Sequence, residues 1–230
     1  MTKISIIIPT LNESEQIQDL LNYLHEQSNT GLINEIIIVD GGSSDGTLEL
    51  IKESPNVRLI HSEKGRARQL NAGAKVATSE VLYFLHADSL PPPKYDQLIL
   101  AEVYKGHPAG CFRLKFHSTH WWLQLAGWFT QFNWKICRGG DQSLFITQKL
   151  FQELGGYDED YLIYEDNILI ETLFKRKTHV VIKAYITTSA RLYEKLGVWK
   201  LQYHFWRIHL KHRFGASPEE LLLYYRRHVS

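Results

Sequence analysis

Two aspartates follow apolar, strand-like runs, where a carboxylate could bind a ligand. Asp40 follows the run EIIIV at 35–39, and Asp88 follows the run VLYFL at 81–85, with three prolines soon after it. In open α/β sheets, ligands bind outside the carboxyl ends of the strands. For each residue alone, the alternative is an Asp that forms a turn or caps a helix. Their neighbours in the fold must decide between the two interpretations.

Three basic residues, Lys64, Arg66 and Arg68, cluster at the predicted start of a helix over residues 65–75. Cations there oppose the helix macrodipole, which suggests that an anion lies nearby. A solvated basic face is the alternative. Phosphate bound here, with paired carboxylates close to it, would attract a divalent cation, because Mg²⁺ binds through one or two carboxylates together with substrate phosphates.

The elements that would position these residues form four consecutive β-α units. Alternation and apolar runs predict strands over residues 4–9, 35–40, 57–61 and 81–85. Asn12 or Ser14 is the expected N-cap of the first helix. Right-handed crossovers place all four carboxyl ends on one edge of a parallel sheet. Asp40, Arg66 and Asp88 would then share one crevice in an α/β sheet that binds a nucleotide or phosphate.

Composition excludes several classes of protein. The 230 residues carry 26 basic and 25 acidic side chains, so no global field favours nucleic acid. Cys111 and Cys137 have no metal-ligand spacing, and the first residues lead into a strand without a signal-peptide pattern. No apolar stretch approaches the roughly 20 residues that span a bilayer. We expect a cytoplasmic protein, with peripheral attachment to a membrane left open.

Five segments carry a family resemblance through their order and spacing. They are IIIPTLNE at 6–13, IIVDGGSSDGT at 37–47, GRARQLNAGA at 65–74, LHAD at 85–88 and GGDQ at 139–142. Together they resemble the family 2 glycosyltransferases of the GT-A fold. The last three look most like the branch associated with radical-SAM, selenodomain or arsenosugar gene neighbourhoods. The resemblance covers nearly the whole chain.

The resemblance implies an α/β protein with a mostly parallel central sheet flanked by helices. We expect a single GT-A domain over residues 1–230. Its parts would be a Rossmann-like half that binds the nucleotide sugar (1–90), an acceptor and catalytic half (91–190), and C-terminal amphipathic helices (191–230).

The resemblance further implies a nucleoside-diphosphate-sugar donor, UDP- or GDP-linked, at the carboxyl edge of the sheet. Pro9 and Glu13 would lie near the nucleoside, Asp40 would contact the base, and Arg66 would face the base or diphosphate. Arg191 would clamp the phosphates. The implied donor-binding residues are Pro9, Glu13, Asp40, Gly65, Arg66, His86, Ala87 and Arg191.

Asp88 is the implied ligand of a divalent metal, Mn²⁺ or Mg²⁺. The family's metal motif is commonly Asp-x-Asp, whereas this chain has His86-Ala87-Asp88. A neutral imidazole suits Mn²⁺ better than Mg²⁺. Two roles for His86, as metal ligand and as nucleotide contact, stay open. Gly41 stands where many relatives carry a second Asp, so the base that is read also stays open.

In the second half, Glu165 and Asp166 resemble the family's acidic motif at a helix start. The resemblance makes Asp166 the general base of an inverting transfer, because an acceptor hydroxyl is a poor nucleophile until a carboxylate removes its proton. Helix capping is the alternative, since acids favour the first turn. Asp141 and Gln142 would line the acceptor site by the same analogy.

Two aromatic segments point to an apolar partner or to core packing. Residues 121–129 read WWLQLAGWF, and Trp199, Tyr203, Trp206 and Leu210 share one face of a predicted helix beside a basic face. The first segment suits an apolar acceptor pocket, a lipid surface or the core. For the helix, attachment to an anionic membrane and packing on the domain are the two interpretations.

The sequence therefore predicts an enzyme of the hexosyltransferase class that moves a sugar to an unknown acceptor, a lipid or a small molecule. The alternative is an inactive nucleotide-binding or membrane-docked accessory protein of the same fold, which His86 motivates. A dinucleotide-dependent oxidoreductase is excluded, because residues 10–14, TLNES, lack the required glycine fingerprint.

Overall fold

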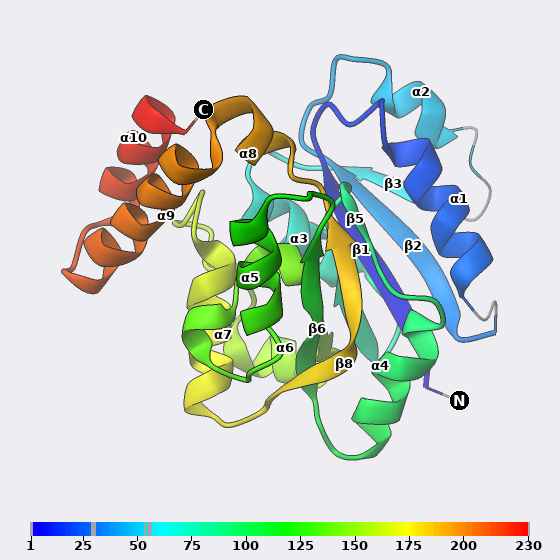
Figure 1. Cartoon of the computed structure of the whole chain (residues 1–230). Coiled ribbons are helices and arrows are strands. Elements are labelled where there is room, and N and C mark those ends of the chain that lie inside the picture. The colour runs from blue at the N-terminus through cyan, green and yellow to red at the C-terminus, as the bar shows by residue number, and fades with distance from the viewer. Residues whose placement is uncertain (1, 29–30, 53, 55–56, 230) are drawn as a thin grey trace.

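A computed structural model describes residues 2–28, 31–52, 54 and 57–229. One eight-stranded sheet in the order β3-β2-β1-β4-β7-β6-β8-β5 runs through the protein (Figure 1). The strands are β1 Ile4–Thr10, β2 Ile33–Asp40, β3 Val57–His61, β4 Val81–Phe84, β5 Ser89–Leu90, β6 Ala109–Phe116, β7 Leu144–Thr147 and β8 His179–Thr188. The helices are α1 Ile17–Gln27, α2 Thr47–Lys52, α3 Arg66–Val76, α4 Tyr95–Tyr104, α5 Trp121–Phe129, α6 Gln148–Leu154, α7 Glu165–Lys175, α8 Arg191–Leu196, α9 Val198–Arg213 and α10 Pro218–His228, with 3-10 turns η1 Lys135–Cys137 and η2 Gly140–Gln142.

The first four strands are parallel and confirm the predicted β-α units. β1 pairs with β2 and β4, and β2 pairs with β3, all in parallel. Thr10 lies opposite Asp40, and Asp40 lies opposite His61, so the strand ends are neighbours along one edge. The other strands form a mixed half, in which β7 is antiparallel to β4 and β6 while β6 and β8 are parallel. The predicted mostly parallel α/β sheet is therefore confirmed.

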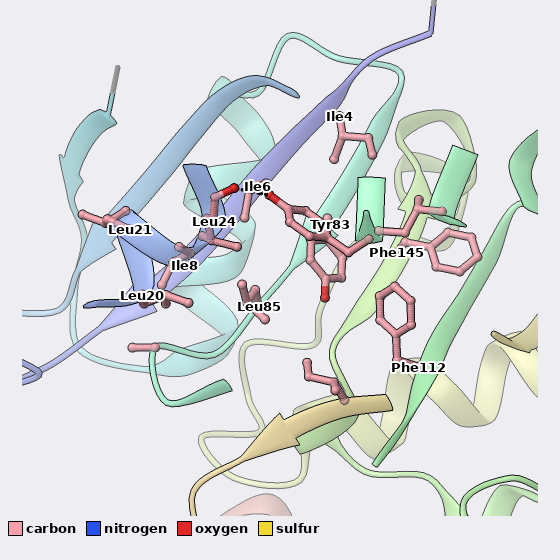
Figure 2. Close-up of a cluster of buried hydrophobic side chains, with 14 of the residues drawn as sticks. Ile4, Ile6, Ile8, Leu20, Leu21, Leu24, Tyr83, Leu85, Phe112 and Phe145 are labelled. Atoms are coloured by element: carbon pink, nitrogen blue, oxygen red, sulfur yellow. Dashed lines mark hydrogen bonds between the residues drawn. The ribbon is translucent and has the colours of Figure 1, made fainter. Parts of the chain in front are cut away.

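Helices cover both faces of the sheet, which is why its central strands are apolar along their whole length. On one face, the side chains of Ile4, Ile6 and Ile8 pack with buried residues of α1, α2, α4 and α5. Figure 2 shows this cluster continuing through Tyr83 and Phe145 to Phe112. On the other face, alternate β1 and β2 residues pack against α3, α6 and α7.

Helix α3 lies unusually close to the sheet, and this fixes the position of its first residue, Arg66. A Cβ added at Gly73 would lie 2.4 Å from Cγ2 of Ile7 and 3.0 Å from Cγ2 of Val39. No larger residue fits without moving the strands, because such contacts are far below van der Waals distance.

The C-terminal helices α9 and α10 form a pair that projects from the body beyond α8 (Figure 1). Helix α9 packs through Leu201, His204 and Ile208, which are buried. Its aromatic face, from Trp199 to Leu210, is about half exposed, and Trp199 and Trp206 contact Trp122 of α5. None of the described helices is both long and apolar enough to cross a membrane.

Candidate functional site

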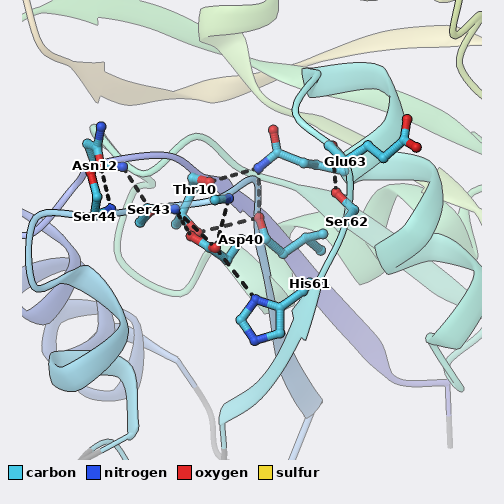
Figure 3. Close-up of polar contacts among 11 residues, drawn as sticks. Thr10, Asn12, Asp40, Ser43, Ser44, His61, Ser62 and Glu63 are labelled. Carbon is cyan, nitrogen blue, oxygen red and sulfur yellow. Dashed lines mark hydrogen bonds and ion pairs between the residues drawn. The ribbon is translucent and has the colours of Figure 1, made fainter.

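Two loops at the carboxyl ends of β1 and β2 are joined by hydrogen bonds (Figure 3). The backbone N–H of Asn12 donates to Oγ of Ser43, and Oδ1 of Asn12 accepts from the N–H of Ser44, each at 2.9 Å. The N–H of Ser14 donates to Oδ2 of Asp45 at 3.1 Å. Helix α1 instead begins after Gln16, without a side-chain cap. The expected N-cap at Asn12 or Ser14 is therefore wrong, because the second loop recruits both residues.

Asp40 organises the second of these loops. Its carboxylate accepts from the N–H groups of Gly42 and Ser43 at 2.8 and 3.1 Å, and Oδ2 lies 3.5 Å from Nδ1 of His61. Burial would raise the pKa of Asp40, but the bonds from Ser43, Gly42 and His61 together lower it. The side chain is 1% exposed, so it faces the loop backbone rather than open solvent.

Gln69, a buried residue of α3, holds the ends of β1 and β2 together. Its Nε2 donates to the carbonyl oxygens of Thr10 at 2.8 Å and Val39 at 2.7 Å. Pro9 lies beside Val39 in the register. Gly65, at φ 146°, turns the chain into α3 where an L-residue would be strained. One helix thus positions both strand ends and Arg66.

Arg66 contacts the acidic pair at the start of α7, beside the region at the carboxyl ends of β1, β2 and β4 that we call the crevice. Its Nη1 lies 3.5 Å from Oε1 of Glu165 and 3.8 Å from Oδ2 of Asp166. Burial would lower the pKa of Arg66, but these two carboxylates raise it. The basic cluster at this helix start therefore has protein carboxylates beside it, since Arg68 likewise pairs with Glu63.

Glu165 and Asp166 are almost completely buried, with 2% and 8% of their surface exposed. Burial, and then the charge of Glu165, raise the pKa of Asp166 to about 7, although Arg66 acts in the opposite direction. Tyr164 precedes the pair in a left-handed conformation, at φ 74°, which turns the chain so that both acids enter the first turn of α7. Asp166 can therefore exchange a proton near neutral pH.

A cavity of about 10 Å³ lies beside Asp166 and is also lined by His86, Ser143 and Tyr157. This volume is near the minimum that holds one water. The Tyr157 hydroxyl is buried without a hydrogen-bond partner among the described residues, and Asp166 is near enough to affect its pKa. Burial, and then Arg66, lower the pKa of His86 to about 3, so its imidazole is neutral. His86 thus lies on the Asp166 side of the crevice.

Tyr157 was not predicted from the sequence. Asn71 of α3 holds it: Nδ2 of Asn71 donates to its carbonyl at 2.9 Å, and Oδ1 accepts from its N–H at 2.9 Å. The pair is separated by 86 residues, so no local pattern reveals it. The preceding glycines at 155 and 156 were the only signal of a special backbone there.

Arg191, the first residue of α8, joins the segments that follow β1 and β4 to the end of β8. Its Nη2 lies 3.2 Å from Oε2 of Glu13 and 3.9 Å from Oδ2 of Asp88. The short antiparallel pair of β5 and β8 brings these residues together, because Ser89 follows Asp88 and pairs with Thr188. Burial raises the pKa of Glu13, although Arg191 lowers it.

Asp141 lies between the two arginine clusters. Asp141 is exposed to solvent. Its pKa is nevertheless raised, by desolvation from surrounding protein atoms and then by the charge of Asp88, while Arg66 lowers it. Gln142 is buried, and its amide bonds to Nη1 of Arg138 at 3.0 Å and to the carbonyl of Cys137 at 3.1 Å. Asp141 therefore faces the crevice, whereas Gln142 is held inside the protein.

The residues around Asp88 offer few protein ligands for a divalent metal. No group of three or more His, Cys, Asp or Glu ligands occurs among the residues that the structure describes. Asp88 is nonetheless partly open to solvent, with 30% of its side chain exposed, and it adjoins Ala87, which is buried. One accessible carboxylate fits a Mg²⁺ or Mn²⁺ ion whose other ligands are phosphate oxygens and water.

Two arginines therefore lie along the carboxyl edge of the sheet, and each of them contacts two carboxylates. Arg66 contacts the acidic pair, and Arg191 contacts Glu13 and Asp88. Tyr225 of α10 is close enough to Arg66 for the two to affect each other's pKa, so a C-terminal helix borders the crevice. Such an arrangement can bind a polyanion at one end and remove a proton at the other.

Comparison with known proteins gives the same picture at the level of family. The model of glycosyl transferase family 2 matches residues 5–156. The uncharacterized glycosyltransferase YibD of Escherichia coli is 35% identical over 103 residues, which is 42% of this chain and 29% of that protein. The dolichol-phosphate mannosyltransferase of Pyrococcus furiosus is 32% identical over 109 residues, which is 45% of this chain and 31% of that protein. The chain thus matches less than a third of the length of either relative.

Solved structures of glycosyltransferases share the GT-A fold. TarS 1-349 of S. aureus in complex with UDP aligns with a TM-score of 0.66 at 20% identity, over 81% of this chain and 60% of that one. The mannosyltransferase PcManGT from Pyrobaculum calidifontis, in complex with GDP-Man and Mn²⁺, aligns with a TM-score of 0.64 at 22% identity, over 90% of this chain and 60% of that one. At such identities the likeness establishes the fold, as the resemblance predicted.

Proposed function

The chain belongs to glycosyl transferase family 2, and on that premise we propose that it moves a sugar from a nucleoside-diphosphate-sugar donor to an acceptor hydroxyl. The observation that carries this proposal is the contact of Arg66 with a buried Asp166 whose pKa is raised to about 7. Solved neighbours hold UDP and GDP-Man, which supports a UDP- or GDP-linked donor.

The proposed reaction is a single displacement with inversion. The Asp166 carboxylate takes the proton of the acceptor hydroxyl, and the acceptor oxygen forms a bond to the anomeric carbon. The bond from that carbon to the diphosphate breaks, and its electron pair leaves on the diphosphate oxygen. Glu165 keeps Arg66 next to the base, and Arg66 and Arg191 offset the charge that develops on the leaving group.

Donor binding is assigned to the carboxyl edge of β1, β2 and β4. Pro9, Glu13 and Asp40 would border the nucleoside, with Asp40 acting through the loop that it organises. Gly65 and Ala87 would allow the donor to approach the backbone. Asp141 would face the acceptor, while the buried Gln142 would shape that site through Arg138.

A divalent metal belongs to the same proposal, with Asp88 as its protein ligand. When bound, the ion would neutralise charge on the donor diphosphate. PcManGT was solved with Mn²⁺, which supports Mn²⁺ or Mg²⁺ here. Of the two roles open for His86, we assign it a contact with the nucleotide sugar rather than with the metal, because it lines the cavity beside Asp166, the proposed base.

We propose that the acceptor is a lipid or a small molecule, and that the protein acts in the cytoplasm or at the membrane surface. Relatives named for dolichol-phosphate and undecaprenyl-phosphate transfer support a lipid. The narrower kinship with the radical-SAM, selenodomain or arsenosugar branch rests on residues 65–74, 85–88 and 139–142. An inactive accessory protein is disfavoured, since a pure binder needs no buried acid poised near neutral pH.

A thermal-shift screen of nucleotide sugars with Mn²⁺ or Mg²⁺ tests the proposal, because a ligand that binds only the folded state raises the melting temperature. We expect one donor to stabilise the wild type in a metal-dependent way. Asp88→Ala should lose the metal dependence, whereas Asp160→Asn, an exposed acid, should not. A flat response to every donor would favour the accessory protein instead.

A further inference from the structure

Exposed aromatic side chains gather on α5 and α9, outside the cavity beside Asp166. We call it the tryptophan ledge, and it consists of the exposed side chains Trp121, Trp128, Trp199, Tyr203, Trp206 and Leu210. Residues 121 and 128 are seven apart, as are 199 and 206, so each set forms one stripe along its helix. Large exposed apolar patches on a globular protein mark an interaction site.

The two stripes are held against each other by ring contacts. The centroids of Trp121 and Trp199 are 5.8 Å apart, and those of Trp122 and Trp199 are 5.3 Å apart. Nε1 of Trp122 also donates to Oε1 of Gln202 at 3.2 Å. The ledge is therefore a preformed surface, built from segments about 80 residues apart in the chain.

Both chain segments that carry the ledge are basic. Helix α9 carries Lys200, Arg207, Lys211 and Arg213 and no acidic residue, and residues 103–140 carry five basic and no acidic residues. Lys200 and Arg207 flank the aromatic stripe one position further round the helix. Beside Leu210 there is a hollow of about 410 Å³, lined by Arg207, Lys211, Phe214 and Glu220 among others.

We propose that the tryptophan ledge docks this protein on the surface of an anionic lipid bilayer. Trp and Tyr are favoured at the boundary between headgroups and acyl chains, and flanking Lys and Arg residues are attracted to anionic headgroups. A second copy of the chain is a poorer occupant, because a symmetric pair would bring Lys200 and Arg207 of both copies together.

Helix α9, which carries part of the ledge, also borders the site, so docking would bring the site near lipid. On α9, Nδ1 of His209 lies 2.7 Å from the hydroxyl of Tyr164, which directly precedes the acidic pair. Helix α10, packed on α9, brings Tyr225 near Arg66. This consequence rests on the proposed function, whereas the docking itself does not.

Sedimentation of the full chain with vesicles tests the proposal. Wild type should bind vesicles of equimolar phosphatidylcholine and phosphatidylglycerol, and added salt should weaken this binding. Its binding to vesicles of phosphatidylcholine alone should be at least about ten-fold weaker. Tyr203→Ser/Leu210→Ser should lose at least about ten-fold in binding, since both side chains insert at the interface. Tyr104→Ser, which removes a tyrosine on α4 that is 66% exposed against 54% for Tyr203, should bind like wild type.

Charge is tested separately. Lys200→Glu/Arg207→Glu should lose the preference for anionic vesicles, whereas Lys52→Glu/Lys75→Glu, with the same change in net charge, should keep it. Melting temperatures in the absence of ligand that match that of the wild type would establish that the ledge variants fold. The proposal would be overturned if wild type did not bind vesicles, or if the ledge variants bound them equally well. It would also be overturned if wild type formed a dimer that the ledge substitutions abolish and bound no vesicles. Vesicle binding retained by a transfer-inactive Asp166→Asn would separate docking from the proposed reaction.

Discussion

Nη1 of Arg66 lies 3.8 Å from Oδ2 of Asp166, although the two residues come from opposite halves of the chain. This contact gives Arg66 a second function beside any contact with a donor: it stabilises the charged form of the buried acid. The carboxylates of Glu165 and Asp166 in turn raise the pKa of Arg66. The proposed donor edge and the proposed acceptor side are therefore electrostatically linked.

Removing this link should move the pH dependence of transfer. Asp166 must be deprotonated to act as a base, so activity should fall as the pH drops through its pKa of about 7. Arg66→Ala removes a charge that lowers this pKa, so the acidic limb of kcat against pH should shift upward by about one unit. Arg66→Lys keeps the charge and should shift it less. An unchanged limb in Arg66→Ala would contradict the link.

The same acid should make the protein less stable at alkaline pH. The pKa of Asp166 is raised in the folded state, so its stabilising contribution is present below its unfolded pKa and is lost as pH rises through about 7. Asp166→Asn should therefore be more stable than wild type at pH 8, by ~2 kcal/mol in urea unfolding. The difference should shrink at pH 5. A variant that is less stable at both pH values would mean that Asp166 is chiefly structural.

Several parts of this fold and site could be predicted from the sequence, and others could not. The apolar runs before Asp40 and Asp88 predicted β2 and β4, because strands covered on both faces read as continuous apolar segments. The shared edge followed from the handedness of crossovers. The family's segment order then led to Asp166 at a helix start.

What the sequence did not reveal depends on contacts between distant segments. Nothing local indicates that Asn71 holds the backbone of Tyr157, or that Arg66 lies against Asp166. Likewise, helical spacing identified the stripe from Trp199, but only the fold determines whether such a stripe is buried or exposed.

Gln69 is one such residue, and its loss should loosen the donor edge. Gln69→Ala leaves the carbonyl groups of Thr10 and Val39 without their donor in a buried place. We expect a loss of about 1–3 kcal/mol in the free energy of unfolding, together with weaker donor binding. Gln97→Ala, on the exposed side of α4, is the matched control and should change neither. Equal stability of the two variants would contradict the role of Gln69 in holding the ends of β1 and β2 together.

The central claim is that Asp166 is the base of a sugar transfer, and the most direct measurement compares donor binding with turnover in Asp166→Asn. The acidic side chain is replaced by an amide of the same shape, so the donor-induced thermal shift should be nearly unchanged. Turnover of the preferred nucleotide sugar should fall by about 10²–10⁴-fold, the usual contribution of a general base. Asp160→Asn should keep both properties. Turnover that survives in Asp166→Asn, or a parallel loss of donor binding and turnover, would contradict the claim.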